Sequence, residues 1–134
     1  MTYLKLYALT TLAFFAIDLV WLGVVASSFY QKHLGPILRP DIVWGAALAF
    51  YALYIAGILV FAVVPGLQAG SLVRAVSLGA FFGLVAYATF DLTGMALIRE
   101  FNWTVVIVDL IWGTVLTGSV AAAGFAAGQW LGVG

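Results

Sequence analysis

Hydrophobic residues fill four long stretches of this chain, and polar residues gather in the short segments between them. The stretches cover residues 6–28, 42–64, 72–98 and 103–131. Each is long enough to cross a bilayer as an α-helix, which takes about 20 apolar residues. The pattern predicts an all-α, polytopic integral membrane protein, a four-transmembrane-helix bundle in which residues 1–134 form a single transmembrane domain.

Residues that start or stop helices stand at the ends of these stretches. Asp41, Ser71 and Asn102 each come at or just before a stretch, where a side-chain oxygen can accept hydrogen bonds from the free amide groups of a helix start. Pro65 followed by Gly66 is expected to stop the second helix at its predicted end.

The composition supports a membrane protein and excludes several other classes. Hydrophobic residues make up 66% of the chain and charged residues 7%, with a mean hydropathy of +1.19. Soluble domains carry about 25% charged residues, so this surface needs membrane lipid around it. The formal net charge is zero, and nothing suggests nucleic-acid binding. The absence of cysteine excludes thiol chemistry. With His33 as the one histidine, no metal site is expected, and the sequence leaves any cofactor unknown.

A short motif occurs in both the first and the last stretch. Residues 17–21 read IDLVW, and residues 108–112 read VDLIW. Since successive spans alternate in direction, these two helices would run antiparallel, which allows an inverted pseudo-repeat of the kind found in many transporters. Chance is the alternative, because apolar helices draw on few residue types. Basic residues are too evenly spread to fix the orientation in the membrane, with a slight bias toward a cytoplasmic position for the first and third loops.

Three aspartates inside the apolar stretches are the most informative feature: Asp18, Asp91 and Asp109. An aspartate at the centre of a membrane helix costs about 2.5–3.5 kcal/mol on insertion scales, and such residues often mark functional sites. Alternating helix directions put Asp91 and Asp109 in one half of the bilayer, with Asp18 at the same depth or slightly deeper. Close carboxylates cannot all be ionised at low cost, which suits proton binding or acid–base chemistry. Alternatively, each acid is a hydrogen-bonded strut between helices.

Aromatic and hydroxyl side chains lie one helical turn from the aspartates. Trp21, Trp112 and Tyr87 share helix faces with the three acids and could hold an amphipathic or cationic ligand by charge and cation–π contact, or serve only in packing. Thr93 could hydrogen-bond an acid, or the backbone of its own helix, which is more common.

Glycines spaced by four residues predict close helix contacts. Gly79 and Gly83 form a GxxxG motif, and Gly124, Gly128 and Gly132 continue the same spacing in the last stretch. Such faces let helix backbones approach within one chain or between copies in a homo-oligomer.

The chain resembles a family of small bacterial predicted membrane proteins catalogued as domain of unknown function 2177. Residues 14–23, 29–36, 54–57, 83–93 and 109–114 carry the resemblance. It implies about four membrane helices and a multi-pass place in the bacterial inner (cytoplasmic) membrane, and it brings no established activity. The positions that match the motifs of this family are Asp18, Trp21, Tyr87, Asp91, Thr93, Asp109, Trp112 and Gly113.

Three functions fit these residues. The first is binding or proton-coupled transport of a lipophilic or cationic small molecule at the carboxylates. The second is an enzyme acting on a lipid or isoprenoid-like substrate within the bilayer. The third is a structural or assembly subunit of a larger membrane complex, in which the acids pair with basic groups of a partner.

Overall fold

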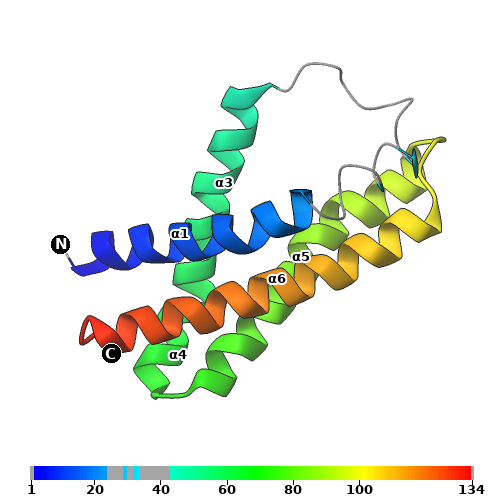
Figure 1. Ribbon diagram of the computed structural model, residues 1–134. Coiled ribbons are helices and arrows are strands. Elements are labelled where there is room, and N and C mark those ends of the chain that lie inside the picture. The colour runs from blue at the N-terminus through cyan, green and yellow to red at the C-terminus, as the bar shows by residue number, and fades with distance from the viewer. Residues whose placement is uncertain (1, 24–28, 30–31, 34–42, 134) are drawn as a thin grey trace.

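The computed structural model describes residues 2–23, 29, 32–33 and 43–133 (Figure 1). This part of the chain is helical and contains no strand, as predicted. Its four helices that are long and apolar enough to cross a membrane are also as predicted. The predicted cap Asp41 lies outside the described residues. The elements are α1 (Thr2–Trp21), α3 (Trp44–Ile58), η3 (Leu59–Val63), α4 (Val64–Ala69), α5 (Leu72–Leu97) and α6 (Trp103–Trp130).

Side-chain caps set the starts of the last two helices. The Ser71 hydroxyl accepts a hydrogen bond from the Arg74 amide at 3.1 Å, and the Asn102 side chain accepts one from the Val105 amide at 3.1 Å. Both caps had been predicted from the sequence. The first helix begins at Thr2, earlier than the predicted residue 6.

The second helix does not stop at Pro65, contrary to the prediction. Proline lacks an amide hydrogen, so an ordinary α-helical bond to the carbonyl four residues earlier cannot form there. The backbone instead widens into a π-helical turn, η3, in which the Val64 amide donates to the Leu59 carbonyl. The chain then continues through Pro65 into α4, and α3, η3 and α4 form one span over Trp44–Ala69. Gly70, with a φ of 63°, ends it.

Three of the four spans lie side by side. In Figure 1, α5 and α6 run antiparallel along much of their length, α1 follows α6, and the two chain ends lie near each other. Two glycines bring α5 and α6 together: a Cβ atom on Gly79 would lie 2.6 Å from the Ala121 Cβ, and one on Gly83 would collide with the Gly113 carbonyl. This part of the GxxxG pattern therefore packs the chain internally.

The second span crosses the other three instead of lying along them (Figure 1). Its close packing is concentrated at η3 and α4, against α5. Small residues allow this approach, since a Cβ on Gly66 would lie 2.5 Å from that of Ala75. Farther toward the start of α3, Tyr54 stacks on Phe82 of α5, with ring centroids 5.3 Å apart. Beyond this contact the two helices diverge, which leaves a wedge between α3 and α5 (Figure 1).

Candidate functional site

Asp91 on α5 is buried without a hydrogen-bond donor. It is 1% exposed, and neither of its carboxyl oxygens has a hydrogen-bond partner among the described residues. The side chain that interacts with it is another carboxyl group, that of Asp109 on α6. Two ionised carboxylates are both acceptors, so the contact between these two groups needs a proton held between them or a shared donor.

Asp109 reaches Asp91 because both lie near the same end of the α5–α6 pair. Asp91 lies roughly two turns before the end of α5, and Asp109 lies roughly two turns after the start of α6. Side by side, the antiparallel helices place these positions at one depth. The predicted proximity of these two acids is thus found in the structure.

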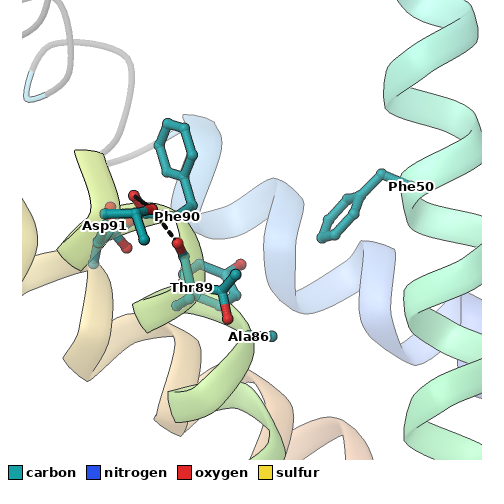
Figure 2. Close-up of a pocket in the computed structure, with 8 residues that line it drawn as sticks. Phe50, Ala86, Thr89, Phe90 and Asp91 are labelled. Carbon is teal, nitrogen blue, oxygen red and sulfur yellow. Dashed lines mark hydrogen bonds between the residues drawn. The ribbon is translucent and has the colours of Figure 1, made fainter. Parts of the chain in front are cut away.

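A cleft of about 610 Å³ opens beside the acid pair. This volume is within the range of ordinary small-molecule sites, about 300–1,000 Å³. Figure 2 shows Phe50 reaching from α3 toward Asp91 and its neighbours on α5, across the wedge between the two helices. The lining is largely aromatic with two acids: Phe50, Ala86, Tyr87, Thr89, Phe90, Asp91, Thr93 and Asp109.

Asp18 is held by an aromatic side chain and is not among the residues that line the cleft. It lies on α1, is 6% exposed, and is hydrogen-bonded by the side chain of Trp112 on α6. Since an indole can only donate, its N–H serves the carboxyl oxygen. Trp21 stacks on Trp112, with ring centroids 4.4 Å apart and planes 8° from parallel. In the part of the chain that the structure describes, Asp91 and Asp109 line this cleft without Asp18, which faces the α1–α6 contact.

Tyr87 and Thr93 both line the cleft, but in different ways. The Tyr87 ring lies over Gly113, where a Cβ atom would collide with it, and meets Tyr54 edge-on at 6.4 Å. The Thr93 hydroxyl donates to backbone carbonyls of its own helix, including that of Phe90 at 3.1 Å. Of the two roles considered for Thr93, the structure shows backbone bonding.

Two features of this region were not predicted. Phe50 forms the opposite wall of the cleft although it belongs to a helix without acids. Tyr54 and Thr117 share a buried hydrogen bond of 2.6 Å between their hydroxyls. Spacing along one helix does not show which neighbouring helix a side chain such as Tyr54 meets.

The acids of the cleft do not form a metal cluster. Among the described residues, no three histidine, cysteine, aspartate or glutamate side chains come together in a way that could hold an ion. Two carboxyl groups in apolar surroundings favour protons, ammonium groups or hydroxyl donors as ligands.

One protein family matches the chain. The profile of a family described as Predicted membrane protein (DUF2177) matches residues 3–126, which include both acids of the cleft and most of each span. No curated protein and no solved structure matches.

Proposed function

The chain belongs to this family of predicted membrane proteins, and from that premise we propose that it binds a cationic, lipophilic small molecule at the Asp91–Asp109 pair and exchanges it for a proton. The observation that carries the proposal is Asp91, a carboxyl group 1% exposed, with no donor among the described residues, at the wall of a cleft that three aromatic side chains help to line. We further propose that the protein is located in the bacterial inner membrane.

A cation suits this site because of the charges that the spans contain. Helices α3, α4 and α6 have no lysine, arginine or histidine, and the one basic residue of α5, Arg74, lies in its first turn. That position is about 25 Å along the helix from Asp91. An ionised carboxylate in apolar surroundings is costly without a counter-charge, and a ligand cation would supply one. The rings of Phe50, Tyr87 and Phe90 add cation–π attraction.

Proton exchange follows from the same charge argument. Without a cation, the two facing carboxyl groups are most cheaply kept as a pair that shares a proton. A bound cation takes over the neutralisation, and the proton leaves. Binding would then release protons and weaken as the solution becomes more acidic.

A calorimetric and pH-stat titration of the purified full chain with phenethylammonium tests the proposal. This probe combines an aromatic ring with an ammonium group. The ammonium stays charged at neutral pH, as the lysine side chain does with its pKa of about 10.4. We expect saturable binding with up to one proton released per ligand. Asp91→Asn should weaken binding about tenfold or more, the loss expected for a hydrogen bond to a charged group.

Glu100→Gln is the matched control, because it makes the same change of carboxyl to amide at an exposed loop residue. It should bind phenethylammonium as the unaltered chain does. The proposal is wrong if binding is absent, or if it is equally strong in Asp91→Asn protein that is shown to be folded.

The other two functions stay hypotheses. An enzyme would use the same acid pair on a lipid substrate, and an altered lipid composition in a deletion strain would favour it. A subunit of a larger complex would co-purify with partners in mild detergent. No contact among the described residues favours either of them over ligand binding.

A further inference from the structure

We infer that the ligand of the cleft is a single-chain amphiphile with a primary ammonium head, whose hydrocarbon chain lies in a second groove between α3 and α5. The inference rests on the proposed function, because it takes the Asp91–Asp109 pair as the head-group site. It adds the chemical class of the ligand and its path of entry.

The head group is assigned from the unmet acceptors of Asp91. Neither carboxyl oxygen has a donor in the part of the chain that the structure describes, and the neighbouring Asp109 contributes another carboxyl group. A primary ammonium has three N–H donors and a positive charge, so it can serve both acids at once. A hydroxyl group offers one donor and no charge, and a quaternary ammonium offers charge without donors.

The hydrocarbon chain of the ligand is assigned from a groove of about 400 Å³ that adjoins the cleft. Phe50 lines both spaces, so the groove continues from the head-group site along α3 toward η3. Apart from Tyr54, whose hydroxyl is engaged by Thr117, the residues that line it are apolar. From Phe50 to Phe61 the helix advances about 16 Å, comparable to an extended dodecyl chain.

The groove faces the bilayer. Leu53, Val60 and Phe61 are 75%, 60% and 60% exposed, on a helix apolar enough to span a membrane. The hydrocarbon chain of a ligand can therefore enter the groove sideways from the bilayer. Because lipid is as apolar as the groove, the hydrocarbon chain gains little free energy by moving from one to the other. The ammonium–carboxylate contact must therefore supply the selectivity.

Photocrosslinking of the full chain in phosphatidylcholine nanodiscs tests this placement. The probe is dodecylammonium with a diazirine at the end of its chain, and labelled peptides are identified by mass spectrometry. We expect labelling concentrated between Leu53 and Phe61. An excess of dodecylammonium should compete, and dodecyltrimethylammonium, with the same charge and chain but no N–H, should compete about tenfold less well.

Two matched variants test the groove itself. Ala56 lines it and Ala126 is exposed on α6, so Ala56→Phe should block labelling of the groove, whereas Ala126→Phe should not. Phenethylammonium, which has no long chain, should still bind Ala56→Phe protein. This comparison also verifies that the variant is folded.

The outcomes separate this inference from the proposed function. Phenethylammonium binding that depends on Asp91, with probe labels spread evenly over all exposed helices, would overturn the amphiphile and leave the cation site standing. Groove labelling that is equal with either competitor would show that bilayer chains fill the groove without head-group recognition, which also overturns the inference. If neither phenethylammonium nor the probe binds, both proposals fail.

Discussion

Asp18 and Asp91 are both buried aspartates within apolar helices, yet their surroundings differ. Asp18 receives a hydrogen bond from Trp112, and Trp21 stacks on the same indole. For Asp91, the described residues offer no such donor, and the side chain that interacts with it is a second acid, Asp109. A satisfied acid stabilises a helix contact, whereas an unsatisfied one in a cleft costs stability that a ligand can restore. The two residues are therefore assigned different roles: Asp18 joins α1 to α6, and Asp91 is the proposed ligand site.

We predict that Asp18 and Trp112 are energetically coupled. Asp18→Ala and Trp112→Phe should each destabilise the protein by about 1 kcal/mol, and the double variant should cost less than the sum, because both remove the same hydrogen bond. Reversible unfolding in mixed micelles measures this cycle. Asp18→Asn is the control, since its amide oxygen can still accept from the indole. Strictly additive losses would mean that the contact contributes nothing to stability.

The sequence was sufficient to find the important residues but not their partners. The cost of an aspartate in a membrane helix singles out Asp18, Asp91 and Asp109 without any structure. Position along a helix also gives depth, and this placed Asp91 and Asp109 together. It does not give the direction in which a side chain points relative to other helices. For this reason Asp18 was expected in the cavity, whereas the structure places it against Trp112.

At the scale of elements, residue size decides how closely two helices approach. Gly79 and Gly83 let α5 meet α6, and Gly66 lets α4 meet α5. The bulky Phe50 and Tyr54 stand at the end of the second span that diverges from α5. The cleft lies where the second span and α5 diverge.

Gly83 and Gly118 provide a matched test of this packing. A Cβ on Gly83 would collide with the Gly113 carbonyl, whereas one on Gly118 would lie 3.4 Å from the Ala80 Cβ. We expect Gly83→Ala to destabilise the protein by about 1–3 kcal/mol through overpacking. Gly118→Ala should be neutral or stabilising, because alanine favours a helix over glycine by about 1 kcal/mol. Unfolding of both variants in the same micelles is the measurement, and equal effects would contradict this account of the α5–α6 contact.

The number of spans and the starts of the last two helices followed from the sequence, but the end of the second helix did not. Runs of apolar residues with Ser71 and Asn102 before them mark helices by local chemistry alone. Pro65 is also a local signal, and it correctly indicates that an α-helical bond is lost. Pro65 alone does not show that the helix continues to Ala69 through a π-turn. Whether the helix continues depends on its packing against α5.

At the scale of the whole molecule, the two ends of the chain are brought together. The α1 and α6 helices run in opposite directions and meet through the Trp21–Trp112 stack, the tryptophans of the repeated motif (Figure 1). Such a contact between equivalent residues is what a two-fold axis would produce. The aspartates of the repeated motif are not equivalent in their contacts. Asp109 faces Asp91 of α5, whereas the second span contains no acid that could face Asp18. The inverted pseudo-repeat stays a prediction.

Four spans require both ends of the chain to lie on one side of the membrane, and the cysteine-free sequence allows a clean test. Lys5, Gln129 and Glu100 are exposed at the two ends of the molecule. Single cysteines at 5 and 129 should react with an impermeant maleimide from the same side, and one at 100 from the other. If the labels at 5 and 129 appear on opposite sides, one helix does not cross. The second span, which lies across the others, would then be the first candidate for the helix that does not cross the membrane. A chain inserted in both orientations would label partially from each side, but positions 5 and 129 would still agree, because their agreement depends only on an even number of crossings.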